Sequence, residues 1–216
     1  MNKTLKYSII ALASLTVVGG AIVIYRKRRG ISKLAKNAIA IAKHEYEDWN
    51  SEGVQRKEDD SSMYESIKKY WQEGADTFWS KAKMINEAWS AAFISYIMKK
   101  AGAGDDFKYS TSHSVYIRDS INNRKKNKKN PFKGFKPQEV KVEEGDLVCY
   151  PRQGGVNYDS TGAYKSHCDF VIDVKDNIAT SIGGNVSNSV SKTSVELDKE
   201  GKIKDSKYFV VIKNKK

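Results

Sequence analysis

The sequence predicts an α+β domain that follows one N-terminal transmembrane helix. Residues 7–25 are apolar and uncharged, residues 31–121 repeat their apolar side chains with helical period, and short β-branched runs follow Val140. Helices followed by strands are typical of an α+β domain, and short turns between neighbouring strands indicate a largely antiparallel sheet. We therefore divide the chain into a membrane anchor with a basic flank, residues 1–30, and a body, residues 31–216.

The stretch YSIIALASLTVVGGAIVIY, Tyr7–Tyr25, is just long enough for a helix to cross about 30 Å of hydrocarbon. A cleaved signal peptide is the alternative, but the basic run YRKRRG follows instead of an A-x-A-like cleavage site. We expect a single-pass membrane protein. The basic residues after the span favour a body on the cytoplasmic side.

The chain has a formal net charge of +12, which favours an anionic partner such as lipid head groups, the bacterial wall or nucleic acid. Residues 1–30 hold six Lys and Arg and no acid, so they supply +6 of this charge. The basic stretch 122–138 is predicted to be a solvated loop. No RNA- or DNA-binding motif accompanies it, so the sequence disfavours nucleic acid as a partner.

Cys149 and Cys168 are the two cysteines of the chain. Two cysteines exclude a disulfide-dense scaffold, and no zinc-ligand spacing is present, so no metal or other cofactor is expected. A single cross-strand disulfide is one alternative. The sequence favours the other, two reduced and half-buried thiols.

Four helices are expected in the first half of the body. The first starts near Ile31, the second is capped by Ser62 and ends at Gly74, the third follows Trp89-Ser90 and ends at Gly102, and the fourth is capped by Ser110 or Ser112. Five strands are expected after them, at residues 146–150, 169–174, 178–182, 189–197 and 208–213.

Three histidines can be judged singly. His44 has the surroundings of a surface residue, and His113 lies at a helix start, where capping or core packing explains it. His167 opens a strand, where alternation places it and Asp169 on one face and Cys168 on the other.

Five segments in order carry a resemblance: AWSAAFISYIMKKAG, STSHSVYI, GDLVCYPR, SHCDFV and IGGNVSNSV. The layout resembles the papain-like NlpC/P60 and CHAP peptidoglycan hydrolases, and it is most similar to the bacterial and phage family DUF2272. The similar region covers about residues 34–212. The resemblance implies a papain-like, NlpC/P60-type domain.

The resemblance also implies site residues. Ser90 occupies the position of the nucleophile, His167 that of the general base, and Asn185 that of the residue that orients the imidazole. His113, Asp169 and Trp89 are secondary candidates. The departure is Ser90, because the papain-like enzymes carry a cysteine there and a serine hydroxyl needs a base within hydrogen-bond reach.

Two functions of different class follow. The first is a membrane-anchored hydrolase of amide bonds in peptidoglycan stem peptides or similar peptides, with a Ser-His-Asn site. The second is an inactive module of the same fold that binds wall fragments or peptides. A wall substrate favours a periplasmic or extracellular body, against the cytoplasmic side that the charge rule indicates.

Overall fold

The computed structural model describes residues 17–18, 21–22 and 30–216, and the chain divides into two compact units, Met1–Gly30 and Ile31–Lys216. In the first unit, β1 (Val17–Val18) pairs antiparallel with β2 (Ala21–Ile22). The rest of the predicted span, residues 7–25, lies outside the described residues. Among the residues that are described, no helix is long and apolar enough to cross a bilayer.

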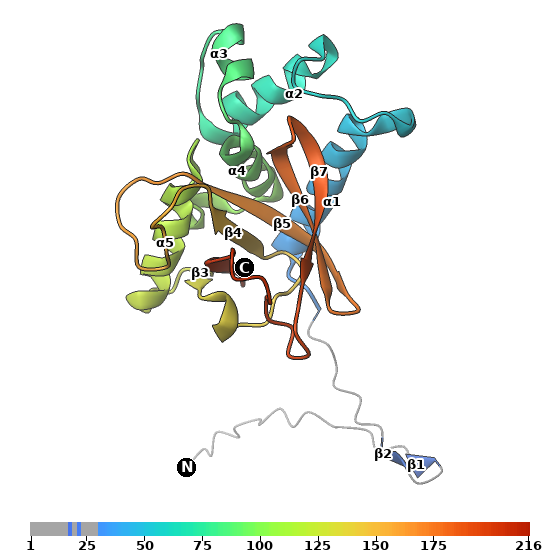
Figure 1. The fold of residues 1–216 in the computed structure, drawn as a ribbon, viewed down its shortest axis with the longest axis vertical. Coiled ribbons are helices and arrows are strands. Elements are labelled where there is room, and N and C mark those ends of the chain that lie inside the picture. The colour runs from blue at the N-terminus through green and yellow to red at the C-terminus, as the bar shows by residue number, and fades with distance from the viewer. Residues whose placement is uncertain (1–16, 19–20, 23–29) are drawn as a thin grey trace, which may run out of the picture. The chain divides into compact units, whose positions relative to one another are not determined.

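The body is α+β, with helices first and a sheet after them, as predicted (Figure 1). Its helices are α1 (Lys33–Trp49), α2 (Tyr64–Lys69), α3 (Lys81–Asn86), α4 (Ser90–Ala101) and α5 (His113–Lys125). A π-helical turn, Tyr70–Gly74, continues α2. Short 3-10 turns lie at Ser51–Gly53, Ser61–Met63, Gly104–Asp106 and Pro137–Glu139.

Local signals explain most helix ends. The Ser32 hydroxyl accepts a hydrogen bond from Ala35 N at 3.1 Å and caps α1, and Gly102 ends α4 with φ of +90°. The predicted cap at Ser62 is wrong. Asp60 is the capping residue, because its carboxylate accepts from Ser62 N at 2.9 Å.

Six antiparallel strands form the sheet, in the order β3-β8-β4-β5-β6-β7. They are β3 (Phe132–Phe135), β4 (Leu147–Pro151), β5 (Ser166–Lys175), β6 (Ile178–Val186), β7 (Ser189–Glu196) and β8 (Val210–Asn214). The prediction of a solvated loop over residues 122–138 is wrong in part. α5 runs into this stretch, and β3 forms because Phe132 is buried against the ring of Phe107, 5.3 Å away between centroids.

Alternation along the strands divides the buried side chains into two clusters. One side of β5, with Cys168 and Phe170, belongs to the large core shared with α1, α4 and α5. The other side, with Val171, belongs to a smaller cluster closed by the chain around Leu197 and Tyr208. The helices therefore cover one face of the sheet.

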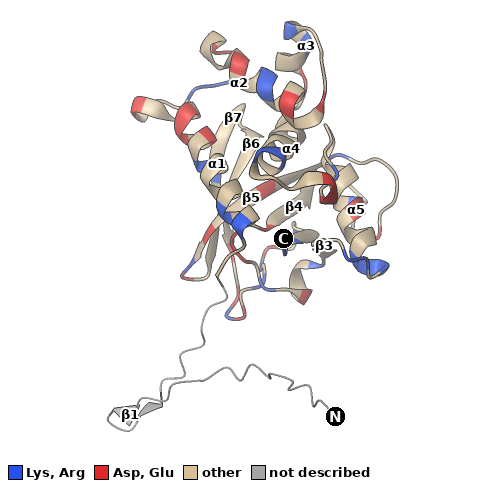
Figure 2. Cartoon of the chain, turned by 180° about the vertical axis from the view of Figure 1, so that it is seen from behind, with Lys and Arg blue, Asp and Glu red and all other residues tan. Residues whose placement is uncertain are grey.

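Charged residues of both signs are interspersed along the body, with a group of basic residues near the end of α5 (Figure 2). Many of them form exposed ion pairs, such as Lys99 with Asp76 at 2.8 Å. Such pairs contribute little to stability. A buried pair joins Asp146, just before β4, to Lys213 of β8 and fixes these two strands.

Cys149 of β4 and Cys168 of β5 are joined in a disulfide. The preference for two reduced thiols is therefore wrong. The two residues are direct partners in the β4–β5 register, with Cα atoms 4.1 Å apart, and both are fully buried. The pairing of β4 with β5 brings the two cysteines together, and this pairing cannot be read from their separation of 19 residues in the sequence.

Replacing both cysteines by alanine is expected to lower the free energy of unfolding by about 2–4 kcal/mol, because the disulfide restricts a loop of 19 residues in the unfolded chain. Urea unfolding of the two proteins measures this difference. Wild-type protein that has been unfolded, reduced and refolded in reductant is the control, and it should match the double variant. Equal stability of the oxidised and reduced proteins would contradict the prediction.

Candidate functional site

Trp89 fixes the start of α4. Its side chain is fully buried and stacks on Trp49 and Tyr70, with centroids 5.1 and 5.5 Å away, and its Nε1 donates to Glu58 Oε2 at 3.0 Å. From the sheet, β6 approaches the same helix closely at Gly184, where a Cβ would lie 2.5 Å from the ring of Phe93. The first residue of α4, Ser90, is thereby held in one position.

The hydroxyl of Ser90 is hydrogen-bonded to a histidine. Its Oγ lies 2.7 Å from Nε2 of His113, the first residue of α5, and the other ring nitrogen of His113 is hydrogen-bonded to the hydroxyl of Tyr116. All three residues are buried. With the imidazole proton on Nδ1, Tyr116 accepts and Ser90 donates to Nε2, which is the arrangement that a serine nucleophile needs.

The pKa of His113 lies well below its usual value of 6.5. Burial of the ring is the largest cause, followed by the positive charges of His167, when protonated, and of Arg152. His113 is therefore neutral at pH 7. A neutral imidazole has the lone pair that a general base requires.

This depressed pKa predicts a pH dependence of stability. Below about 6.5 the unfolded chain binds a proton that folded His113 does not, so the free energy of unfolding falls as pH drops through this range. Urea unfolding at pH 7.5 and 5.5 should show a smaller loss for His113→Gln than for wild type. Ser120→Ala, at a buried serine that carries no titratable group, is the control and should leave the loss unchanged. Equal losses for wild type and His113→Gln would contradict the assignment.

The second imidazole has both nitrogens engaged. His167 Nε2 lies 2.8 Å from Asp169 Oδ1, and Nδ1 lies 3.1 Å from Nη2 of Arg152. A guanidinium only donates, so Nδ1 accepts and the ring proton of neutral His167 sits on Nε2, pointing to Asp169. The His167 ring lies beside that of His113, with centroids 5.1 Å apart.

Asp169 is held from both sides of its carboxylate. Oδ1 accepts from His167, and Oδ2 accepts from Thr193 Oγ1 of β7 at 3.2 Å. Gly183 of β6 makes room for it, because a Cβ there would lie 1.9 Å from Asp169 Oδ1. The first glycine of the IGGNV segment thus accommodates the buried carboxylate.

Asn185 lies against Trp89. It follows Gly183 and Gly184 at the β6 irregularity and has φ of +55°. When its amide oxygen is oriented toward the donors of Trp89, it lies 3.3 Å from both the backbone N and Nε1. Asn185 therefore supports the residue that precedes Ser90, and its contacts here are with Trp89.

An open pocket of about 380 Å³ adjoins the start of α4. Its walls come from the end of α3 and the following turn, the connector before α2, the end of β4 and the β6–β7 turn. The lining residues are Glu58, Ile85, Asn86, Glu87, Ala88, Arg152, Asn185, Ser187 and Asn188. Ala88 is two residues from Ser90, so the pocket lies near the start of α4, but Ser90 itself is buried and does not line it.

The structure brings the six predicted site residues into three contacts: Ser90 with His113, His167 with Asp169, and Asn185 with Trp89. The direct contact of Ser90 with His167 that the resemblance implies stays a prediction. Sequence reasoning missed three further residues, Tyr116, Arg152 and Thr193. The helical spacing of Tyr116 from His113 was the one available signal.

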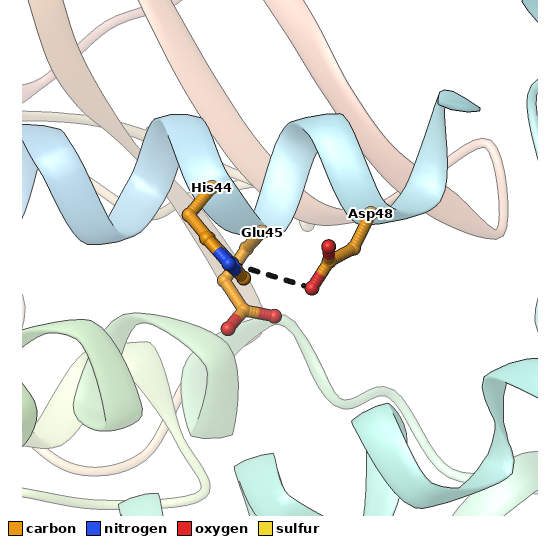
Figure 3. Close-up of side chains that lie close together, drawn as sticks. All are labelled: His44, Glu45 and Asp48. Carbon is orange, nitrogen blue, oxygen red and sulfur yellow. Dashed lines mark ion pairs between the residues drawn. The ribbon is translucent and has the colours of Figure 1, made fainter. Parts of the chain in front are cut away.

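A separate group on α1 brings together possible metal ligands, His44, Glu45 and Asp48 (Figure 3). His44 Nδ1 and Asp48 Oδ2 are 3.3 Å apart on the surface. Both carboxylate oxygens of the buried Glu45 already have partners, because Lys69 Nζ lies 2.9 Å from one oxygen and the Tyr70 hydroxyl donates to the other. This carboxylate serves an internal ion pair, and we assign no metal to the group.

Residues 53–215 match a family described as "Uncharacterized protein conserved in bacteria (DUF2272)". No curated protein and no solved structure matches the chain. The match spans α2 to β8 and includes every residue of the pocket and of the three contacts.

Proposed function

The chain belongs to the DUF2272 family, and we propose that it is a hydrolase of amide bonds, acting on the stem peptides of peptidoglycan or on similar peptides. The observation that carries this proposal is the hydrogen bond between Oγ of Ser90, the first residue of α4, and Nε2 of a neutral, buried His113, the first residue of α5. A base in contact with the hydroxyl is the minimum that a serine nucleophile requires.

The proposed reaction uses His113 as the base. Ser90 transfers its proton to His113 Nε2 while Oγ bonds to the carbonyl carbon of the amide. The first N–H groups of α4 have no partner within the helix and can hold the developing oxyanion. His113 then gives the proton to the leaving nitrogen as the C–N bond breaks. Water attacks the acyl-enzyme in the same way and releases the acid.

The fold arrangement supports a papain-like domain. A helix begins with the nucleophile candidate and packs on an antiparallel sheet, one strand of which opens with Ser166-His167. In the proposal, His167 and Asp169 do not contact the substrate and instead orient the His113 ring. The imidazole of His167, hydrogen-bonded to a carboxylate, favours one orientation of the His113 ring.

The disulfide supports a body outside the cytoplasm. Disulfides persist in oxidising compartments, whereas cytosolic thiols are kept reduced. An extracytoplasmic body anchored through residues 7–25 would reach the wall, so this observation favours the wall substrate over the charge rule. The basic residues 26–29 and the basic stretch 122–138 would attract anionic lipids and wall polymers.

A binding module is the second candidate, and the burial of Ser90 favours it. Only 4% of this residue is exposed, so a substrate carbonyl reaches Oγ only if the pocket wall near Ala88 moves. If that wall stays in place, the pocket holds a peptide without turnover.

Incubation of the purified full-length protein with purified peptidoglycan tests the proposal. Hydrolysis releases one new amino group for each amide bond cut, which amine labelling and mass spectrometry detect. New amines are the expected result. Saturable binding of peptidoglycan without new amines would support the binding module instead.

A further inference from the structure

We infer that Arg152 is the receptor for a free carboxylate on the peptide ligand, and that binding of this carboxylate releases His167. This inference rests on the proposed function for the identity of the ligand as a peptide. It adds a recognition group and a coupling between the pocket and the buried site.

Arg152 is the group that connects the pocket with the imidazoles. It is exposed, it lines the pocket, and its Nη2 lies 3.1 Å from Nδ1 of the fully buried His167. Its guanidinium carbon lies 6.0 Å from the ring centre of Tyr150, at the outer limit of a cation–π contact. One end of Arg152 therefore faces solvent while the other contacts the site.

No carboxylate among the described residues 30–216 forms an ion pair with Arg152, whereas surface cations such as Lys99 and Arg124 are paired with acids. Its contact is a neutral imidazole, a weaker partner for a guanidinium than a carboxylate, which accepts two parallel charge-assisted hydrogen bonds. The open pocket beside it gives a carboxylate access.

The rest of the pocket selects against polyanions. Glu58 and Glu87 line it, and Asn185, Ser187 and Asn188 add uncharged polar groups. Two acids near one arginine repel nucleic acid or a polyphosphate but tolerate a single carboxylate, especially on a ligand that also carries an amine. The terminus of a peptide has this chemistry.

Binding changes His167 because Arg152 is its Nδ1 donor. A guanidinium that turns to a carboxylate in the pocket leaves Nδ1 with a free lone pair, while Nε2 remains bound to Asp169. It also moves a positive charge that lowers the pKa of His113. Occupancy of the pocket thereby sets the basicity of the imidazole that contacts Ser90.

Calorimetry on the full-length Ser90→Ala protein tests recognition without turnover, with acetyl-D-alanyl-D-alanine and its C-terminal carboxamide as probes. We expect the acid to bind at least about tenfold more tightly than the carboxamide. Arg152→Gln should abolish this preference, and Arg152→Lys should keep part of it. Arg124→Gln is the matched control and should keep all of it, because Arg124 is paired with Glu139 on another surface.

Nitrogen NMR of the ring signals tests the release of His167. The chain has three histidines, so substitution of each assigns its signals. The acid should shift the His167 Nδ1 signal toward the position of a ring nitrogen that accepts no hydrogen bond. Arg152→Gln should cause the same shift without ligand, and the carboxamide should cause none.

Equal affinity for the two probes, or no binding of either, would overturn the carboxylate receptor, and an unmoved Nδ1 signal at saturation would overturn the coupling. Because binding is measured in Ser90→Ala, the inference and the proposed function fail separately. A clear preference for the acid in a protein that cuts no amide bond leaves the receptor standing and removes the hydrolase.

Discussion

Ser90→Ala is expected to reduce the proposed turnover of peptidoglycan by about 10⁴-fold or more, as removal of the nucleophile does in serine hydrolases. The variant should remain folded. It leaves His113 Nε2 without its partner, which costs about 1–3 kcal/mol, and alanine suits the first turn of a helix. Amine release and urea unfolding measure the two effects.

Ser120→Ala is the matched control for Ser90→Ala. Ser120 is also a buried serine, but its hydroxyl donates to the carbonyl of Ile117 on the far part of α5. Its removal should cost a similar free energy of unfolding and leave turnover unchanged. Equal loss of turnover in both variants would show that stability, not chemistry, is being measured.

Ser90→Cys separates a working site from a decayed one. Both native cysteines are held in the disulfide, so the introduced thiol is the single free one and reacts alone with iodoacetamide. A thiol attacks without a full alkoxide, so this variant should retain activity that alkylation removes. If wild type and Ser90→Cys are both inert on peptidoglycan that wild type binds, the binding module is correct.

The general organisation of the body follows from sequence patterns. Helical periodicity, the glycine at residue 102 and the turn at residues 175–177 predict elements that depend on neighbours close in sequence. The prediction that the turn at residues 198–202 joins neighbouring strands is wrong, because β8 pairs with β3 and β4 and not with β7. The short strand β3 could not be predicted in this way. Its hydrogen bonds go to β8 at the end of the chain, and its burial depends on Phe107.

The candidate site shows the same limit. Order along the chain identified the segments that carry Ser90, His113 and His167, but not which imidazole contacts Ser90. That choice depends on where α5 starts relative to α4, a tertiary relation between residues 23 positions apart. Arg152 and the disulfide were missed for a similar reason, since the pairing of β4 with β5 determines the disulfide and brings Arg152, just beyond β4, to His167.

The two histidines therefore give the second large prediction. His113→Gln is expected to lower turnover by about 10³-fold or more, because it removes the base in contact with Ser90 while an amide of similar length fills the space. His167→Gln should lower it by only about 10-fold, since the proposal has His167 act through the His113 ring, whose centroid is 5.1 Å away. His44→Gln, at an exposed site on α1, should change nothing.

The alkylation rate of Ser90→Cys gives the same comparison without substrate. A neighbouring imidazole that accepts the thiol proton raises the fraction of thiolate, so the rate at pH 7 reports which histidine is the base. Adding His113→Gln to Ser90→Cys should slow alkylation strongly, and adding His167→Gln should slow it little. The reverse ranking in both assays would return the role of base to His167. Ser90 would then have to leave His113 and turn to His167 before it attacks, and the hydrogen bond at 2.7 Å would describe a resting state of the enzyme.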